Sequence, residues 1–331
     1  MKAAWYERKG TGPEIFQVGE LETPQPGPGE VRVRLAFAGV NPSDYKRRDP
    51  RRNGEAMEFP RIISGMDGAG TIDEVGPGVA PERRGERVWV YEAQLGRPFG
   101  TYAEYVVVPA RNAVRLPDGV RLEDGACLGV PAMTAHRAVF ADGSVAGKTV
   151  LVAGGAGAVG FCAAQFARWG GASVIATVRS PQKAAFLRDA GFEAVVNIKE
   201  ADPVGAIRRL SGGRGVDRII EVDFTENFEL DRSVLADGGV ISTYSPAKEA
   251  GAAPPASLYA LMRLNAAVEF VYVYTMSDEA KAAAIRDITR GLEAGLFQRQ
   301  LAIKRFRLED AGRVQQEVEQ GTLGGRALIE L

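Results

Sequence analysis

The residues best suited to chemistry form a glycine-rich run near the middle of the chain. Its members give the spacing G-x-G-x-x-G: Gly155, Ala156, Gly157, Ala158, Val159 and Gly160. The apolar segment Thr149–Ala153 before the run fits a strand, and Ala158–Trp169 fits the helix that follows. In such a unit the first glycine permits a tight turn. The second lets a pyrophosphate approach the backbone, and the third lets the helix pack on the strand. The run predicts a dinucleotide site; the alternative is a glycine-rich turn that binds nothing.

The loop after the next predicted strand, Ser173–Val178, indicates which dinucleotide binds. NAD sites usually carry an Asp or Glu at this point, which binds the ribose hydroxyls. The segment Ala172–Arg188 contains no acidic residue and offers Arg179, Ser180 and Lys183 instead. Two cations and a hydroxyl suit a 2′-phosphate. We therefore expect NADPH as the cofactor. The alternative is a solvated loop in which Lys183 opens a helix.

The elements that must position these residues fall into two groups along the chain. Up to about residue 120 the sequence predicts short strands broken by Gly and Pro, as in a β-barrel or sandwich. The segment from Val31 to Phe37 shows the alternation of a half-buried strand. Further strands are expected at Gly70–Val75, Arg87–Tyr91 and Tyr102–Val108.

From Lys148 to about Tyr272 apolar strands alternate with helices, which favours a parallel, doubly wound sheet and an α/β fold class. After the first two strands, further strands are expected at Ala194–Asn197, Asp217–Val222, Gly239–Thr243 and Val268–Val273, and a second helix at Gln182–Ala190. The tail beyond Asp278 predicts a helix and then a strand–helix–strand pattern ending at Ala327–Leu331.

Composition limits the classes of partner. The 331 residues carry a formal net charge of −1 and no long block of like charges, so we expect neither a nucleic-acid nor a membrane partner. No signal peptide or membrane span is expected. The two cysteines, Cys127 and Cys162, lie in apolar segments and predict buried thiols, so we expect a cytoplasmic protein.

Several segments taken together resemble the medium-chain dehydrogenase/reductase superfamily, and most closely its zinc-independent quinone oxidoreductase (zeta-crystallin-like) branch. In chain order these are Gly39-Val40-Asn41-Pro42-Ser43-Asp44, Gly65-Met66-Asp67-Gly68-Ala69-Gly70, Val75-Gly76, Gly100-Thr101-Tyr102-Ala103-Glu104-Tyr105, Thr134-Ala135 and Gly324-Gly325-Arg326-Ala327. The resemblance implies a GroES-like catalytic domain, a Rossmann domain and a homodimer. We expect residues 1–123 and 274–331 to form the first domain and residues 124–273 the NADPH-binding domain.

Zinc alcohol dehydrogenases of this superfamily carry a cysteine in the first of these segments and a His-Glu pair in the second. Asn41 and Met66-Asp67 stand at those places here. Zinc needs thiolate, imidazole or carboxylate ligands, and a thioether is a poor substitute. We therefore expect no metal; a carboxylate-rich site around Asp44 and Asp67 is the alternative. Without a Lewis acid, alcohol oxidation is disfavoured, whereas a quinone or conjugated enone is already electrophilic.

The resemblance also implies roles for single residues. Asn41 and Tyr45 are expected to contact cofactor or acceptor, with Asp44 ordering them, although each could simply hold its loop. Thr134 is expected beside the nicotinamide. His136, the single histidine, is expected to be a packed or capping residue on a buried helix rather than a proton donor.

The sequence thus predicts an NADPH-dependent, zinc-independent reductase that transfers hydride to a quinone or conjugated enone. One alternative is an enoyl or alkenal reductase of the same superfamily. The other is a protein that binds NADPH without turnover, in a structural or sensor role.

Overall fold

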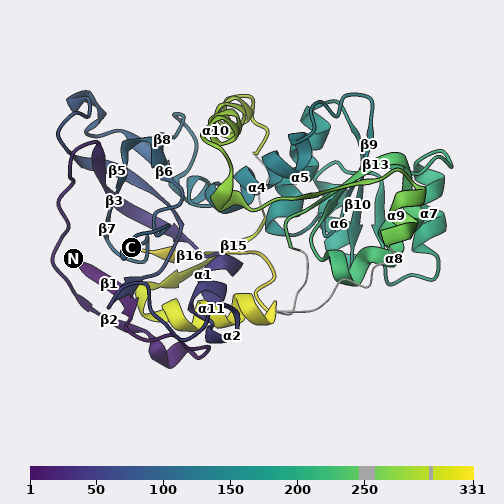
Figure 1. Ribbon diagram of the computed structural model, residues 1–331. Coiled ribbons are helices and arrows are strands. Elements are labelled where there is room, and N and C mark those ends of the chain that lie inside the picture. The colour runs from purple at the N-terminus through teal and green to yellow at the C-terminus, as the bar shows by residue number, and fades with distance from the viewer. Residues whose placement is uncertain (246–257, 298–300) are drawn as a thin grey trace. The chain divides into compact units, whose positions relative to one another are not determined.

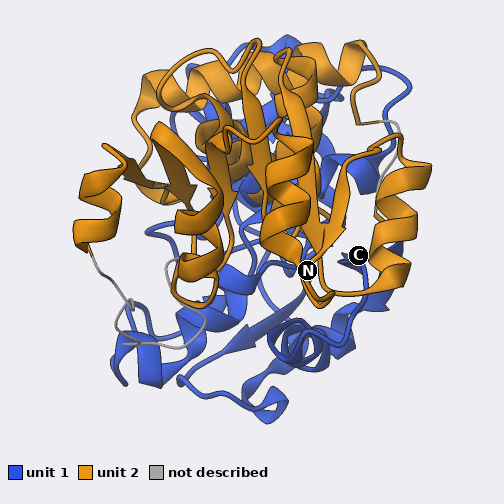
Figure 2. Ribbon diagram, turned by 90° about the vertical axis from the view of Figure 1, so that its right-hand side faces the viewer, with its two compact units in different colours: residues 1–130, 302–331 blue, residues 131–301 orange. Residues whose placement is uncertain are grey.

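The computed structural model describes residues 1–245, 258–297 and 301–331, and these form two compact units (Figures 1 and 2). Unit 1 contains Met1–Val130 and Ala302–Leu331, and unit 2 contains Pro131–Leu301. The chain therefore leaves unit 1, builds unit 2 and returns. No described helix is both long and apolar enough to cross a bilayer.

Unit 1 consists mainly of strands. They are β1 (Lys2–Tyr6), β2 (Gln17–Glu20), β3 (Glu30–Gly39), β4 (Ile62–Ile63), β5 (Asp67–Val75), β6 (Arg87–Val90), β7 (Tyr105–Pro109), β8 (Ala113–Arg115), β15 (Ile303–Arg307) and β16 (Arg326–Glu330). Its helices are α1 (Pro42–Arg48), α2 (Pro50–Asn53), α3 (Leu122–Gly125) and α11 (Ala311–Gln320). One sheet has the order β2-β1-β4. The other has the order β15-β16-β3-β5-β6-β8, with β7 also paired to β3.

The long strand β3 organises the larger sheet, because it pairs with β5, β7 and β16. Its alternation is confirmed: Val31, Val33 and Leu35 are buried in one apolar cluster with Ile72 of β5 and Val106 of β7. The arginines between them face outward, as a half-buried strand requires.

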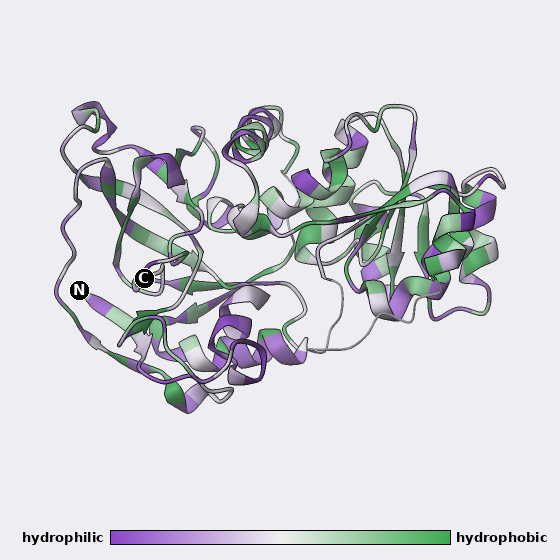
Figure 3. Cartoon of the chain, in the orientation of Figure 1, coloured by the Kyte–Doolittle hydropathy of each residue, from purple (hydrophilic) through white to green (hydrophobic). Residues whose placement is uncertain are grey.

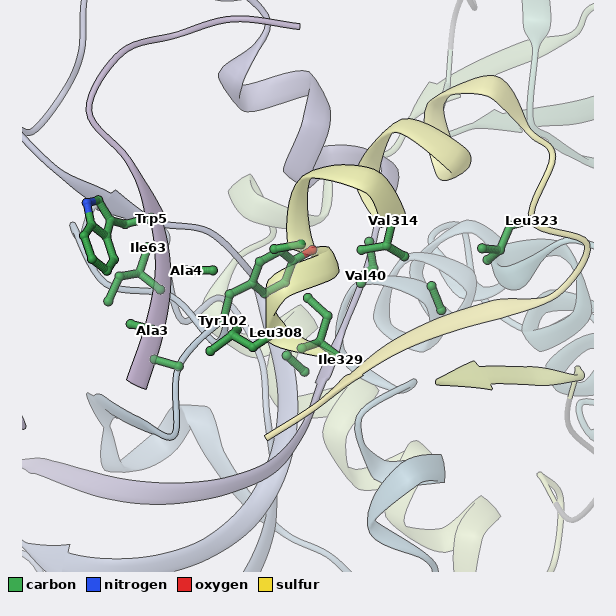
Figure 4. Close-up of a cluster of buried hydrophobic side chains, with 14 residues drawn as sticks. Ala3, Ala4, Trp5, Val40, Ile63, Tyr102, Leu308, Val314, Leu323 and Ile329 are labelled. Carbon is green, nitrogen blue, oxygen red and sulfur yellow. The ribbon is translucent and has the colours of Figure 1, made fainter. Parts of the chain in front are cut away.

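A second apolar cluster joins the two ends of the chain (Figure 4). Ala4 and Trp5 of β1, Val314 of α11 and Ile329 of β16 pack together with Tyr102. The C-terminal segment thereby completes the core of unit 1, which explains why the chain must return to it after unit 2.

Unit 2 has one parallel sheet with helices between its strands. The strands are β9 (Thr149–Val152), β10 (Ser173–Val178), β11 (Val195–Asn197), β12 (Val216–Glu221), β13 (Leu235–Thr243) and β14 (Ala267–Phe270). The helices are α4 (Gly129–Phe140), which begins at the end of unit 1, α5 (Ala158–Trp169), α6 (Pro181–Asp189), α7 (Pro203–Leu210), α8 (Phe224–Val234), α9 (Leu258–Arg263) and α10 (Asp278–Glu293). Single turns of 3-10 helix occur in both units, at Pro13–Ile15, Pro81–Arg83, Ala110–Asn112, Val273–Thr275 and Leu308–Asp310.

The sheet order β11-β10-β9-β12-β13-β14 places the first strand, β9, in the middle. The chain moves outward to β10 and β11 on one side and then to β12, β13 and β14 on the other. The carboxyl ends of β9 and β12 therefore lie side by side where the winding reverses, the usual position of a ligand crevice in such sheets. The central strand β9 is apolar and buried from Val150 to Val152, and the strands of this sheet are mostly green in Figure 3.

The boundaries between the units differ from those expected at residues 123 and 273. Helix α3 packs on β3, β5 and β6, so unit 1 extends to Val130. Helix α10 belongs to unit 2: its Asp287 is bonded to His136 of α4 at 2.8 Å. Just beyond α10, the ring of Phe297 packs edge-to-face against Phe166 of α5. In this division the chain returns to unit 1 at Ala302 rather than at residue 274, because α10 and Phe297 contact α4 and α5 of unit 2.

Candidate functional site

The glycine turn links β9 to α5 in unit 2. Gly157 precedes the helix with φ −91° and no side-chain cap on the helix N-terminus. The first helical hydrogen bond runs from Phe161 N to Gly157 O, so the amides of Ala158, Val159 and Gly160 come before it. Free amides at the positive end of a helix dipole form an anion site. The turn can therefore hold the pyrophosphate of a dinucleotide.

At each of the three glycines of the motif, a side chain would be disfavoured for a different steric reason. A Cβ on Gly155 would lie 2.8 Å from the Ala176 Cβ of β10, and one on Gly160 would lie 2.4 Å from the Gly154 carbonyl oxygen. These two glycines permit packing. Gly157 is exposed, and a Cβ there would lie 3.2 Å from the same oxygen. Gly157 thus keeps the outer surface of the turn open, where a phosphate can approach.

Thr177, on β10, supports the turn from the neighbouring strand and was not foreseen from the sequence. Its buried hydroxyl accepts a hydrogen bond from Gly154 N at 3.2 Å, and its carbonyl accepts one from Gly155 N at 3.0 Å. A hydroxyl inside the apolar run of β10 was the available signal, since buried hydroxyls need partners.

The loop after β10 carries the residues expected to bind a 2′-phosphate. Arg179 and Lys183 are exposed, and Ser180 is the N-cap of α6, where its Oγ accepts from Lys183 N at 3.4 Å. The alternative interpretation is correct in one respect, since Lys183 does lie in the first turn of a helix. Arg179 is not free: its Nη2 donates to Asn227 Oδ1 of α8 at 3.4 Å.

Thr134 and His136 lie on α4, and both are buried. His136 packs against the rings of Phe140 and Phe166, and its Nε2 lies 2.8 Å from Asp287 Oδ2. Burial lowers the pKa of His136, and the bond to Asp287 opposes that shift. The expectation of a packed histidine is confirmed. The position of Thr134 relative to a cofactor stays a prediction.

In unit 1, Asn41 and Asp44 lie at the start of α1 and hold each other. Asn41 N donates to Asp44 Oδ2 at 2.8 Å, and Asp44 N donates to the Asn41 carbonyl at 3.0 Å. The Asn41 side-chain amide donates to Asp67 Oδ2 at 2.8 Å, and Tyr102 Oη donates to Asp44 Oδ2 at 3.2 Å. The geometry thus shows a buried polar network that fixes this loop. Tyr45 is half-buried, and burial raises its pKa.

The two carboxyl groups of this network, on Asp44 and Asp67, are weaker acids than usual. Desolvation by burial raises the pKa of Asp44 to about 7 and the pKa of Asp67 to about 7. Hydrogen bonds from Asn41 to both groups, and from Val130 N to Asp67, limit the shift. Repulsion by Asp67 further raises the pKa of Asp44.

These residues do not fit zinc. Asp67 Oδ2 already accepts hydrogen bonds from Asn41 Nδ2 and Val130 N. Asn41 therefore turns an N–H donor toward Asp67, and an N–H donor cannot ligate zinc. Within the described ranges, no group of three or more His, Cys, Asp and Glu side chains could hold a metal ion. The carboxylate-rich alternative around Asp44 and Asp67 therefore lacks a ligand set.

Two family models match the chain. "Alcohol dehydrogenase GroES-like domain" matches residues 27–118, and "Zinc-binding dehydrogenase" matches residues 158–290. The quinone oxidoreductase of Rattus norvegicus is 33% identical over 231 residues, which are 69% of this chain and 68% of the relative. A 2-haloacrylate reductase of a Burkholderia species is 31% identical over 256 residues, 76% of this chain and 75% of the relative.

Solved structures agree over the whole chain. An NAD-dependent alcohol dehydrogenase superposes with a TM-score of 0.87 at 28% identity, covering all of both chains. A mycobacterial protein complexed with NADPH superposes with a TM-score of 0.85 at 27% identity, also over all of both chains. Both nicotinamide cofactors thus occur in the names of similar structures. The α/β fold, with a GroES-like domain and a Rossmann domain, is confirmed.

Replacing Asp67 tests the buried network. A carboxyl group whose pKa is raised in the folded state binds its proton more tightly there than in the unfolded chain. Its contribution to stability is therefore complete below the unfolded pKa and is lost as pH rises to about 7. Asp67→Asn keeps an oxygen that can accept from Asn41 and Val130 but cannot ionise. We expect the stability of the variant, relative to wild type, to rise between pH 4 and pH 7 by up to about 1.4 kcal/mol per pH unit.

Urea unfolding of both proteins at pH 4, 5.5, 7 and 8 measures this difference. Asp118→Asn, a change at a surface carboxyl in the same unit, is the control. Parallel stability curves for wild type and Asp67→Asn would show that Asp67 does not titrate in this range.

Gly157→Val tests the anion site. The backbone at Gly157 suits any residue, and the new Cβ contacts only the Gly154 oxygen, so unit 2 should stay folded. The side chain would fill the open surface of the turn, and we expect NADPH affinity to fall by about tenfold or more. Calorimetric titration measures the affinity, and circular dichroism checks the fold. Gly160→Val, which meets the same oxygen at 2.4 Å, should instead lose stability. Unchanged NADPH binding by folded Gly157→Val would exclude the turn as the pyrophosphate site.

Proposed function

We propose a function for this chain from its family, since it belongs to the medium-chain dehydrogenase/reductase superfamily, in its quinone oxidoreductase branch. The proposed function is that of an NADPH-dependent, zinc-independent reductase of quinones or conjugated enones. One observation carries the proposal. The loop after β10, next to an anion-binding glycine turn, presents two exposed cations and a serine hydroxyl in a segment that contains no acid.

In this proposal the chain's own residues divide the binding of NADPH between them. The amides before Phe161 and the dipole of α5 hold the pyrophosphate. Arg179 and Lys183 hold the 2′-phosphate by charge-assisted hydrogen bonds, and Ser180 Oγ adds a further polar contact. An acid at the end of β10 would repel that phosphate, so its absence favours NADPH over NADH.

When bound, NADPH supplies the hydride. Reduction of a quinone to a hydroquinone takes this hydride, which carries both electrons and one hydrogen, and one proton, which solvent can supply. Asn41 is hydrogen-bonded to both Asp44 and Asp67, so the part of Asn41 and Asp44 is to hold the α1 loop in place. Tyr45, half-buried on the same helix, remains the candidate for contact with the acceptor.

The relatives support an electrophilic acceptor. The quinone oxidoreductase of Rattus norvegicus is named for quinones, and the Burkholderia reductase for 2-haloacrylates, in which the double bond is conjugated to a carboxylate. Both substrate classes accept hydride without a metal to activate them. A reductase of activated alkenes is therefore the second candidate. The homodimer and the cytoplasmic location stay predictions.

Cofactor selectivity tests the loop after β10. We expect the double change Arg179→Ala with Lys183→Ala to weaken NADPH binding by about 100-fold and NADH binding by less than about twofold, because only NADPH carries the 2′-phosphate. Arg188→Ala, another exposed cation of α6, is the matched control and should change neither. Titrations with both cofactors measure the dissociation constants. Equal losses for NADPH and NADH would remove the 2′-phosphate role.

Turnover tests the reaction class. Purified protein mixed with NADPH and 1,4-benzoquinone, a simple enone or 2-chloroacrylate should oxidise NADPH steadily, as followed by the absorbance at 340 nm. A zinc chelator should leave the rate unchanged, and metal analysis should find no stoichiometric zinc. Tight NADPH binding without consumption on any acceptor would instead support the structural or sensor role, and one zinc per chain would contradict the absence of a ligand set.

A further inference from the structure

A chain of hydrogen bonds runs inward from Arg179 to two carboxyl groups in the interior of unit 2. Arg179 Nη2 donates to Asn227 Oδ1 at 3.4 Å, and Asn227 Nδ2 donates to Glu221 Oε1 at 2.8 Å. Glu221 is in turn hydrogen-bonded to Asp231 of α8. Glu221 and Asp231 are 0% and 1% exposed, so the chain connects a surface cation to fully buried acids.

The two buried carboxyl groups raise each other's cost of ionisation. Burial raises the pKa of Asp231 well above its usual value, and the neighbouring Glu221 raises it further. Burial also raises the pKa of Glu221, against bonds from Asp223 N, Asn227 and Asp231 that favour its ionised form. Both directions favour the proton on Asp231, because Glu221 raises the pKa of Asp231 whereas the bonds to Glu221 favour its ionised form. Two ionised carboxylates in contact inside the protein would be far more costly.

Glu221 determines how Asn227 is oriented, because its Oε1 is the acceptor for two N–H groups. An amide side chain can turn either its oxygen or its nitrogen toward a neighbour, but a carboxylate oxygen accepts hydrogen bonds only. Glu221 Oε1 accepts from both Asp223 N and Asn227 Nδ2, so the amide nitrogen must face inward. The Asn227 oxygen then faces Arg179. Asn227 is 8% exposed, so packing also limits its rotation.

We propose that Asn227 is a specificity-determining residue, which uses its contact with Glu221 to hold the Arg179 guanidinium in place for the 2′-phosphate of NADPH. This inference rests on the proposed function, because it assumes that Arg179 binds that phosphate. Asn227 does not touch the phosphate; it is a positioning residue. Arginine loses considerable side-chain freedom on binding an anion, and a partner that restrains the free side chain lowers that cost.

The contact between Asn227 and Arg179 could not be predicted from local sequence patterns. Asn227 is separated from Arg179 by 48 positions. Arg179 follows β10 and Asn227 lies in the first turn of α8, which follows β12, so only the folded sheet brings the two together. The interaction depends on an uncharged side chain. An acid in its place would pair with Arg179 more strongly and compete with the phosphate.

A double-mutant cycle tests the inference. Dissociation constants for NADPH and NADH are measured for wild type, Arg179→Ala, Asn227→Ala and the double variant, and also for adenosine 2′,5′-bisphosphate against 5′-AMP. We expect Asn227→Ala to lower the NADPH/NADH preference by about fivefold to tenfold, with NADH affinity unchanged. In the Arg179→Ala background, the same change should have no further effect on the preference. Glu226→Ala, an exposed neighbour on α8, is the control and should alter nothing.

A second variant separates the loss of the hydrogen bonds from the loss of packing volume at position 227. Asn227→Leu has a similar volume and makes neither hydrogen bond, so it should reproduce the effect of Asn227→Ala in a folded protein, as circular dichroism and thermal unfolding can check. An unchanged preference in folded Asn227→Leu, or a preference that rises because Arg179 is released, overturns the inference. These outcomes differ from failure of the proposed function, in which Arg179→Ala itself leaves the NADPH/NADH preference unchanged.

Discussion

The close approach of backbone to backbone at the Gly154 carbonyl is the constraint on which unit 2 depends. A Cβ on Gly160 would come within 2.4 Å of that oxygen, so α5 can start against β9 only because Gly160 has none. The missing Cβ on Gly155 similarly lets the turn rest on Ala176 of β10. Thr177 then ties the turn to β10 by two hydrogen bonds. The turn, β10 and the loop at Arg179 consequently form one piece, in which the sheet fixes the distance between the two proposed phosphate sites.

Buried carboxyl groups recur in both units, and one in each unit orders the start of a helix. Asp44 accepts from Asn41 N at the start of α1, and Glu221 accepts from Asp223 N at the start of α8. In both places burial raises the pKa of the carboxyl groups, which shows that their charged forms are poorly solvated there. Apolar replacements would avoid this cost. The carboxyl groups instead fix the backbone just before each helix, because they accept hydrogen bonds from backbone N–H groups there.

The sequence predicted the repeating parts of the fold well. The bounds of Ser173–Val178 and Ala158–Trp169 agree with the structure, because long apolar strands and a glycine-marked helix start are strong local signals. The second domain boundary could not be found in this way. Helix α10 has an ordinary amphipathic sequence, and what assigns it to unit 2 is contact of Asp287 with a histidine 151 positions earlier.

The candidate site shows the same division. The glycine turn and the loop after β10 were predictable because each is a local pattern with its own chemistry. Asn41 and Asp44 were expected at a reaction centre, but their types could not reveal that Asp67 and Tyr102 would engage them. Thr177 and Asn227 were missed for a related reason: a hydroxyl or an amide becomes informative only when tertiary structure supplies its partner.

The residues at the positions where zinc alcohol dehydrogenases carry metal ligands also bear on which acceptors the proposed reductase can use. Asn41 and Asp67 form a hydrogen-bonded pair, and the amide nitrogen of Asn41 points at Asp67 rather than outward. An amide–carboxyl pair of this kind offers neither a Lewis acid nor a free donor to stabilise an alkoxide, which alcohol oxidation requires. Quinones and conjugated alkenes delocalise the negative charge that hydride addition creates over their own oxygens. On this reasoning the acceptor supplies the stabilisation that other members of the superfamily obtain from zinc, and the protein's part is to hold NADPH in a fixed position.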